Sequence, residues 1–230
     1  MKKTIGIIGG ISAASTLQYY KKLTALYYER YQDYYYPEIL IHSLDFQYFT
    51  DLENEKRTQE YIDYISIKVR GLERAGAKVI IMAANSPHSV FKEIESRSNV
   101  PMISIVDSTA LKSKEKHYKK LLLTGIKYTM QSSFYHETFK QYGMKVITPT
   151  EDHQDEINSM IFDELVIQHF YKNTKDRFNE IINSYNVDAI ILGCTELPLL
   201  LSNDDSRIPL LDTISIHVEK TLDYALTKFY

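Results

Sequence analysis

Short, continuous apolar runs alternate along the chain with longer amphipathic segments, and this alternation limits the fold more than any other feature. The apolar runs are residues 4–8, 38–44, 78–84, 102–106, 120–124, 145–147, 188–192 and 210–212. Helical periodicity marks residues 12–31, 55–75, 90–97, 132–142, 158–185 and 215–230. Continuous apolar strands that alternate with helices are buried on both faces, so the pattern predicts an α/β fold with doubly wound parallel sheets.

The two halves of the chain resemble each other. KKTIGIIGG is echoed by KKLLLTGIK, and GAKVIIMAAN is echoed by NVDAIILGCT. We therefore expect two pseudo-symmetric α/β lobes, with residues 1–106 plus 210–230 in the first lobe and residues 107–209 in the second. Ligands of such sheets bind beyond the carboxyl ends of the strands. Residues 9–12, 84–88, 124–129 and 194–197 are then expected to converge on one cleft.

Charge and composition exclude several classes of protein. The chain has 230 residues, with 27 Lys and Arg against 30 Asp and Glu and a net charge of −3, so no basic platform for nucleic acid is expected. No apolar run reaches 18 residues, so no membrane span is expected. A single cysteine excludes an internal disulfide framework and suits a reducing, cytoplasmic location. The histidine spacing predicts no metal site.

Polar residues follow two of the apolar runs where each run ends. Cys194, in ILGCTEL, is either a buried structural cysteine or a reactive thiol exposed beside Thr195 and Glu196. In AANSPH, Asn85 and Ser86 are uncharged donors suited to a carboxylate or amino group, or else ordinary turn formers.

Two further features of the sequence concern turns. Pro87 can start a helix directly after Asn85 and Ser86. Gly9 and Gly10 lack the spacing of a dinucleotide-binding loop. They predict instead a tight turn that presents backbone N–H groups to a carboxylate.

Four segments, in order, carry a family resemblance: IGIIGGISAASTLQYY, AANSPH, TGIKYTMQSSFY and ILGCTELPLLL. They resemble the signatures of the cofactor-independent aspartate/glutamate racemases. The resemblance implies an amino-acid racemase, most closely an aspartate racemase, that uses neither pyridoxal phosphate nor any other cofactor. It also implies a homodimer, a small amino acid or dicarboxylate as substrate, and two cysteines on opposite faces of the substrate α-carbon.

The resemblance assigns roles to particular residues. Cys194 matches the catalytic cysteine of the second lobe, and Glu196 matches a residue beside it. Ala84 occupies the position of the first-lobe cysteine. The residues that match substrate-binding positions, Glu196 included, are Ser12, Asn85, Ser86, Pro87, Thr124, Thr129, Thr195 and Glu196.

The chain departs from the family pattern in two respects. Ala84 has no titratable group, so either this cysteine was deliberately replaced, or His88 or Ser86 acts as the first-lobe base, or racemisation has been lost. Aspartate racemases carry cations where this chain has residues 45–50 and 162–168, which contain none; Lys56, Arg57 and Lys172 are the nearest. Two other functions stay open: a single-cysteine decarboxylase of malonate-like acids, and a non-catalytic amino-acid-binding homologue.

Overall fold

The chain divides into two compact units in the computed structural model, which describes residues 2–227. The first unit is Met1–Ile105 with His217–Tyr230, and the second is Val106–Ile216. We expected residues 210–230 to belong to the first lobe. Instead β8 (Leu210–Asp212) pairs with β7 (Ala189–Leu192) in the second unit, because its backbone completes that sheet. The chain therefore returns to the first unit only after Ile216.

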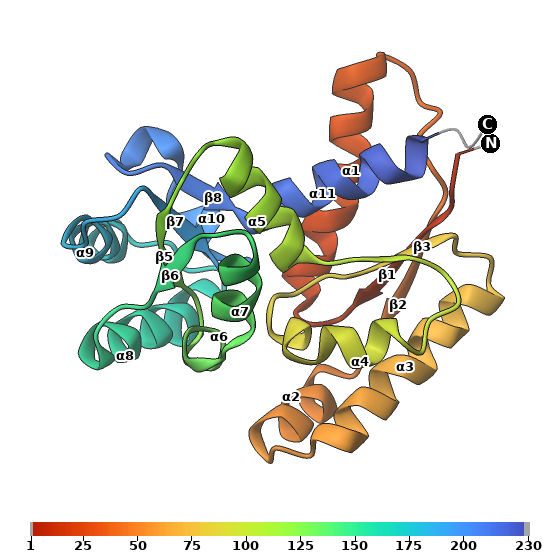
Figure 1. The fold of residues 1–230 in the computed structure, drawn as a ribbon, viewed down its shortest axis with the longest axis horizontal. Helices are drawn as coiled ribbons and strands as arrows, with labels where there is room; N and C mark the ends of the chain where they lie inside the picture. The colour runs from red at the N-terminus through yellow and green to blue at the C-terminus, as the bar shows by residue number, and fades with distance from the viewer. Residues whose placement is uncertain (1, 228–230) are drawn as a thin grey trace. The chain divides into compact units, whose positions relative to one another are not determined.

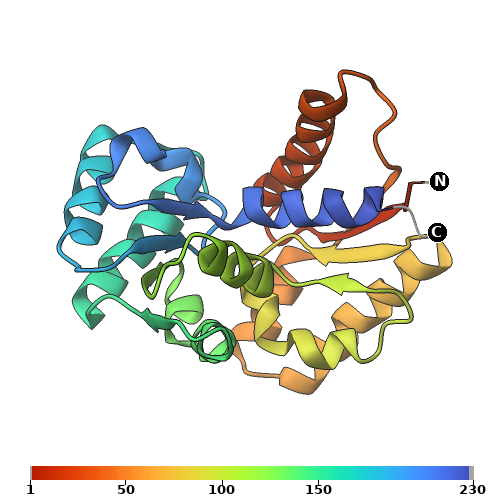
Figure 2. The same ribbon diagram turned by 45° about the horizontal axis from the view of Figure 1, so that its top comes forward.

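In the first unit, four parallel strands form a sheet in the order β2-β1-β3-β4. Its strands are β1 (Ile5–Gly9), β2 (Ile39–Ser43), β3 (Val79–Met82) and β4 (Met102–Ile103). Its helices are α1 (Ala13–Tyr31), α2 (Phe46–Asn54), α3 (Thr58–Arg74), the 3-10 helix η1 (Ser86–Val90), α4 (Phe91–Glu95) and most of α11 (Thr213–Leu226). Helices α1 and α11 lie on one face of this sheet, and α3 and α4 lie on the other (Figures 1 and 2).

The second unit repeats this plan with a parallel sheet in the order β6-β5-β7-β8. Besides β7 and β8, its strands are β5 (Lys120–Thr124) and β6 (Lys145–Ile147). Its helical segments are α5 (Ile105–Glu115), α6 (Lys127–Gln131), α7 (Phe134–Gln141), α8 (Glu151–Ser159), the π-helix η2 (Met160–Leu165), α9 (Lys172–Asn183), α10 (Leu197–Leu200) and the 3-10 helix η3 (Asn203–Asp205). The equivalent strand order in the two sheets confirms the predicted pseudo-symmetric α/β fold.

The central strands are buried on both faces, as their composition predicts. All residues of β1, β3 and β7 are buried, and the side chains of β3 pack into an apolar core that includes Phe49, Leu52 and Ile65. In the second unit, Phe178 and Ile182 of α9 pack on the sheet in a separate core. Each unit therefore has its own hydrophobic core.

Several element boundaries differ from the predicted ones. The strand expected over residues 102–106 ends at Ile103, because the backbone N–H of Ile105 bonds to a side chain and α5 begins there. Helix α2 occupies residues for which no helix or strand was predicted, with Asp45 as its N-cap accepting from the Tyr48 N–H. The final helix was expected to continue to residue 230; α11 ends at Leu226, and residues 228–230 lie outside the described part of the chain.

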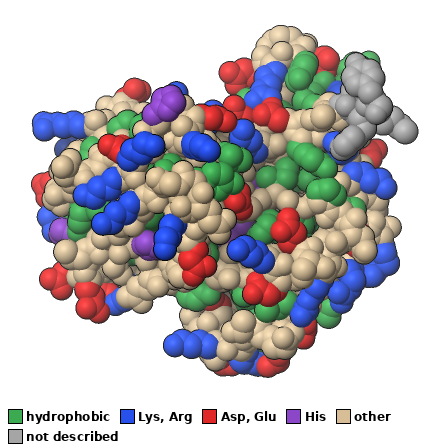
Figure 3. All heavy atoms as spheres, in the orientation of Figure 1, with side chains coloured by type: hydrophobic (Ala, Val, Ile, Leu, Met, Phe, Trp, Pro, Cys, Tyr) green, Lys and Arg blue, Asp and Glu red, His purple; other side chains and the backbone are tan. Residues whose placement is uncertain are grey.

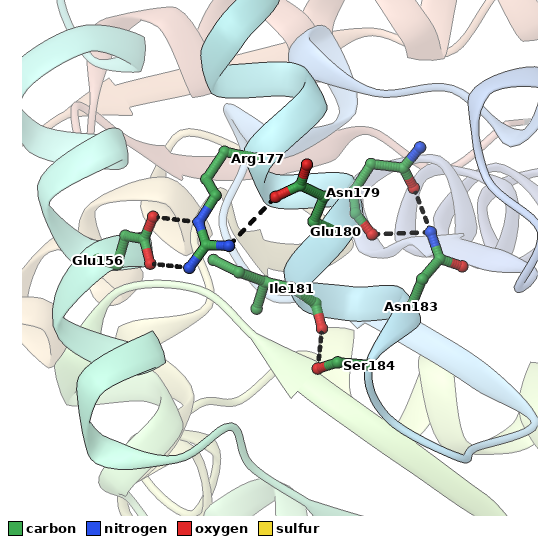
Figure 4. Close-up of polar contacts among 7 residues, drawn as sticks. All are labelled: Glu156, Arg177, Asn179, Glu180, Ile181, Asn183 and Ser184. Carbon is green, nitrogen blue, oxygen red and sulfur yellow. Dashed lines mark hydrogen bonds and ion pairs between the residues drawn. The ribbon is translucent and has the colours of Figure 1, made fainter.

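Surface polar contacts fix the outer helices of the second unit. Arg177 of α9 bonds to both carboxylate oxygens of Glu156 on α8, at 2.7 and 3.0 Å, and also to Glu180 (Figure 4). Side chains of both charge signs appear on the visible face of each unit (Figure 3). Among the described residues, no helix is long and apolar enough to cross a membrane.

Two glycines provide a matched test of the backbone geometry. Gly10 has φ +81° and lies so close to Leu44 that an added Cβ would meet its backbone N at 2.4 Å. We expect Gly10→Ala to lower the free energy of unfolding by roughly 1–3 kcal/mol or more, since strain and overlap add. Gly71 in α3 has open space around it, so Gly71→Ala is expected to stabilise by roughly 0.5–1 kcal/mol. Urea unfolding measures both; equal effects of the two substitutions would contradict the close approach at Gly10.

Candidate active site

In the first unit, the N-terminus of α1 is bonded to the end of β3. The Ser15 hydroxyl donates to the carbonyl of Ala83 at 2.5 Å. Ser12 caps α1 by accepting from the Ser15 N–H at 3.3 Å. The loop that carries Ser12 therefore lies beside the strand end that carries Ala84. By sequence, Ser12 and Ser15 are both candidates for the N-cap of this helix, and the structure assigns the cap to Ser12.

The glycine turn before α1 differs from its prediction. The Gly10 N–H donates to the Thr16 hydroxyl at 2.8 Å, and that hydroxyl donates to the carbonyl of Ser12 at 2.9 Å. The Gly10 amide is therefore already satisfied within the protein. We expected this turn to present its amides to a carboxylate, and for Gly10 that expectation was wrong.

The segment after β3 brings four of the candidate residues together. Ala84, Asn85, Ser86 and Pro87 are consecutive, and all of them are buried. The carbonyl of Asn85 accepts from the backbone N–H of His88 at 3.0 Å, which closes the first turn of η1. Pro87 lies in that first turn, where a proline stabilises a helix start.

His88 has both ring nitrogens occupied. Its Nε2 accepts from the backbone N–H of Ile105 at 3.1 Å, so in the neutral ring the proton is on Nδ1. Nδ1 then donates to the carbonyl of Ala84 at 3.0 Å. Burial and, second, the neighbouring His217 together lower the pKa of His88 to about 3. His88 is therefore neutral and committed to the backbone, which makes it a poor candidate for the first-lobe base.

His217 of α11 continues this buried network in the first unit. Its Nδ1 is 2.8 Å from the Tyr19 hydroxyl, and its Nε2 is 2.8 Å from the carbonyl of Ile103. Because a carbonyl only accepts, Nε2 carries the proton and Tyr19 donates to Nδ1. Burial lowers the pKa of His217 to about 4. The rings of His88 and His217 lie 6.0 Å apart at their centroids.

In the second unit, Cys194 follows β7. Cys194 and Thr195 both donate a hydrogen bond to one carboxylate oxygen of Glu196. The Cys194 thiol donates to Glu196 Oε2 at 3.0 Å, and the Thr195 hydroxyl donates to the same oxygen at 2.7 Å. Cys194 is only 8% exposed, and burial, followed by the charge of Glu196, raises the pKa of its thiol well above the usual value. Of the two readings, the structure therefore fits the buried cysteine, and the raised pKa favours the protonated thiol.

Two threonines of the second unit lie at the same end of the sheet as Cys194. Thr124 ends β5 and donates to the carbonyl of Ile191 at 2.9 Å, so its hydroxyl serves the backbone. Thr129 of α6 is buried, and within residues 2–227 its hydroxyl has no hydrogen-bond partner. A Cβ added to Gly193 would meet the Thr129 side chain at 3.4 Å, so Thr129 borders the glycine that precedes Cys194. A buried hydroxyl without a partner is costly unless a ligand completes it.

Two of the three cations named as the nearest candidates are paired elsewhere. Arg57 bonds to Glu55 and Glu60, and Lys172 bonds to Asp176 at 2.6 Å. The structure therefore gives neither of these two cations a role beside the candidate residues. Within the described residues, no group of three or more His, Cys, Asp or Glu side chains could hold a metal ion.

Comparison with known proteins decides the family. The sequence model of the Asp/Glu/hydantoin racemases matches residues 8–221. The chain belongs to this racemase family. One similar protein is the broad-specificity amino-acid racemase RacX of Bacillus subtilis (strain 168). It is 29% identical over 227 residues, and the alignment covers 95% of this chain and 96% of the relative.

Solved structures agree with this family assignment. An aspartate racemase homologue from Pyrococcus horikoshii OT3 is 38% identical with a TM-score of 0.88, covering 99% of this chain and 100% of that one. The aspartate racemase of Picrophilus torridus is 25% identical with a TM-score of 0.81, covering 99% and 96%. Both similarities cover 99% of this chain, so the fold of the family includes both units.

The environment of Cys194 predicts slow thiol chemistry that depends on Glu196. We expect Cys194 to react slowly with a disulfide reagent at pH 8, because its thiol is buried and protonated. Glu196→Gln removes the negative charge but keeps an acceptor, so the thiol pKa falls and the rate rises by about tenfold, the equivalent of one pKa unit. Stopped-flow absorbance measures the rate. Glu180→Gln, an equal charge change on exposed α9, is the control; equal rates in all three proteins would contradict the coupling.

The two buried histidines predict acid sensitivity of the fold. Their folded-state pKa values, about 3 and about 4, lie below the ordinary histidine value of 6.5, so the unfolded chain binds protons first as the pH falls. Stability is then fully present above pH 6.5 and decreases by about 1.4 kcal/mol per pH unit for each histidine below it. Urea unfolding between pH 7 and 4.5 measures this. His217→Gln is expected to remove about half of the slope, and an unchanged slope in this variant would exclude the assignment.

Proposed function

We propose that this chain is an amino-acid racemase that exchanges the proton on the α-carbon of its substrate, with Cys194 as the acid and base on one face. The observation that carries the proposal is the contact between Cys194 and Glu196 at the end of β7, in a chain of this racemase family. The reaction acts on the α-carbon and its carboxylate, which every amino acid has. It therefore does not depend on the side chain of the substrate.

The proposed step begins with the thiol proton. Cys194 passes it to Glu196 Oε2, 3.0 Å away, which leaves a thiolate beside a neutral carboxylic acid. The thiolate then takes the α-proton, so an S–H bond forms, the C–H bond breaks and its electron pair is delocalised into the substrate carboxylate. The unpaired hydroxyl of Thr129 is suited to donate to that carboxylate. Returning the proton from sulfur to carbon reverses the step.

The opposite face of the α-carbon is where this chain departs from a two-thiol racemase. By the resemblance, Ala84 stands where the second thiol would face the substrate, and a methyl group neither takes nor gives a proton. His88, the nearest histidine in sequence, holds the carbonyl of Ala84 and the amide of Ile105. We therefore propose that proton exchange with retention is fast relative to inversion in this chain.

Other parts of the proposal rest on the resemblance alone. They are a reaction without pyridoxal phosphate or another cofactor, a homodimeric assembly, a cytoplasmic location, and substrate contacts from Ser12, Asn85, Ser86, Pro87, Thr124, Thr129, Thr195 and Glu196. Aspartate is the substrate that this resemblance suggests. Each of these points stays a prediction.

A second candidate function is decarboxylation of a malonate-like acid. Two observations favour it: the chain has one thiol, and that thiol is protonated, which is the form that donates a proton to a carbanion. In this reaction the C–C bond to a carboxylate breaks, CO₂ leaves with no electrons from that bond, and the remaining carbanion takes the Cys194 proton. No base on the opposite face is needed.

Restoring the thiol at residue 84 tests the racemase proposal. We expect Ala84→Cys to raise the rate of L-to-D conversion by about 10²–10⁴-fold, the usual contribution of a positioned acid or base. Ala84→Ser, which adds a hydroxyl of similar size, is the control and is expected to give little gain. Chiral chromatography of a panel of L-amino acids measures conversion, and proton NMR in D₂O measures exchange at the α-carbon.

The outcomes separate the candidate functions. Exchange with retention in the unchanged chain, together with inversion in Ala84→Cys, supports the racemase. Release of CO₂ from a disubstituted malonate, without amino-acid exchange, favours the decarboxylase. Amino-acid binding with no exchange in either protein contradicts both enzymes and indicates a binding homologue.

A further inference from the structure

Helix α1 carries two rows of apolar residues, and only one of them is buried. The buried row packs into the first unit and includes Tyr19, Leu23 and Tyr27. The other row, which we call the outer stripe, consists of Leu17, Tyr20, Thr24, Tyr28 and Tyr31. Its leucine and three tyrosines are between 41% and 70% exposed. A surface helix normally turns polar residues to solvent, so an exposed apolar stripe marks a surface that another molecule covers.

Neighbouring rings hold the tyrosines of the outer stripe in place. Tyr31 stacks on buried Tyr27 with ring centroids 4.8 Å apart, and Tyr28 stacks on Tyr34 at 5.2 Å. Tyr34 and Tyr35 follow α1 and are 77% and 78% exposed, so they extend the apolar surface. The C-terminal half of α1 rises away from the sheet of the first unit, and the segment after it returns to β2 (Figures 1 and 2). Side chains that are already ordered lose little freedom on binding.

The spacing of the outer stripe is symmetric about Thr24. Leu17 and Tyr31 lie seven residues to either side of Thr24, and Tyr20 and Tyr28 lie four residues to either side. A twofold axis at Thr24 therefore places Leu17 of each copy against Tyr31 of the other, when the two helices run antiparallel. The same axis pairs Tyr20 with Tyr28. Steps of three and four residues keep the stripe on one seam, the arrangement in which two helices interdigitate.

The outer stripe can be buried in such a pair without leaving a polar group unsatisfied. None of its five members carries a charge. The Thr24 hydroxyl donates to the carbonyls of Tyr20 and Lys21 at 3.0 and 3.1 Å, so its methyl group is left for packing. Lys21 borders the stripe, three residues from the axis. An antiparallel pair sets this lysine opposite tyrosines of the other copy rather than opposite the same lysine, and an ammonium group is attracted to aromatic rings.

The exposed area is sufficient for a stable pair of subunits. Leu17 and the five tyrosines of the stripe and the following segment expose about 600 Å² of side-chain surface, at roughly 200 Å² for a whole tyrosine. Two copies that cover each other there bury about 1,200 Å², which reaches the lower limit of specific, stable interfaces and exceeds most crystal contacts.

We propose that α1 pairs with the α1 of a second copy of this chain, antiparallel about a twofold axis at Thr24. The outer stripe, extended by Tyr34 and Tyr35, then forms the core of a homodimer interface. The family resemblance implies a homodimer and leaves open which surface forms it. The inference uses residues of the first unit alone and does not depend on the proposed racemase reaction.

Sedimentation equilibrium of the full-length protein tests the pairing. Over roughly 1–200 µM we expect the mass to rise from 26.8 kDa toward twice that value. Thr24→Arg places two like charges face to face at the axis, so it is expected to raise the dissociation constant by more than about tenfold. Ala25→Arg adds the same charge at the next, exposed position, which lies about 100° around the helix and off the stripe. This matched control is expected to leave the dissociation constant unchanged.

A second measurement locates the axis directly. Two paired helices bring residue 24 of one copy within disulfide reach of residue 24 of the other. Oxidation of Thr24→Cys with copper-phenanthroline is therefore expected to link two chains on a non-reducing gel. Ala25→Cys and the unchanged chain, which has only the buried Cys194, are expected to remain unlinked.

Three results would overturn the proposal. The first is a monomer throughout the concentration range, which would leave the outer stripe to a different kind of partner. The second is a dimer that Thr24→Arg does not weaken, which would place the interface on another surface. The third is equal linking of Thr24→Cys and Ala25→Cys. The linking experiment needs no arginine variant, so it decides the matter even if Thr24→Arg does not fold.

Discussion

Backbone carbonyls at the ends of buried strands need hydrogen-bond donors, and this requirement shapes both candidate regions. Beyond the last ladder bond, a carbonyl that is shielded from water is costly unless a side chain reaches it. Ser15 supplies the donor for Ala83, and His88 supplies it for Ala84. In the second unit, Thr124 donates to Ile191 and Thr213 donates to Leu192. Several polar side chains of the sequence motifs therefore form hydrogen bonds with the backbone. Fewer groups are left to bind a substrate than the motifs suggest.

The same comparison shows how much the sequence predicts. The strands and the α/β class follow from apolar runs, because burial on both faces of a parallel sheet leaves little choice of composition. Helix α2 was missed because its apolar residues, Phe49 and Leu52, are few and its cap at Asp45 stands directly after a strand. The role of Ser15 could not be predicted, since its partner carbonyl lies 68 residues along the chain. The role of His88 depends on the amide of Ile105, 17 residues along, which only the folded chain brings to its ring. The burial of Cys194 was one of two readings that the sequence left open, and only packing decides between them.

Each unit also has a carboxylate near a strand end that accepts hydrogen bonds from uncharged side chains. Glu53 receives hydroxyl bonds from Tyr61 and Ser86, and Glu196 receives bonds from Thr195 and the Cys194 thiol. Hydroxyl and thiol donors fix the position of a carboxylate without neutralising it. The negative charge therefore remains available, and in the second unit we propose that it accepts the thiol proton.

The order in which the chain builds its two units has a consequence for synthesis on the ribosome. The second unit is one continuous segment, whereas the first unit includes α11 from the far end of the chain. The Lys3 amide donates to the carbonyl of Ala225, and His217 bonds to Tyr19 and Ile103, so these contacts wait for the last helix to emerge. Domains usually complete their folding from the N-terminus during translation. Here the unit that begins first closes last, and His217, the buried neighbour of His88, is synthesised only after the whole second unit.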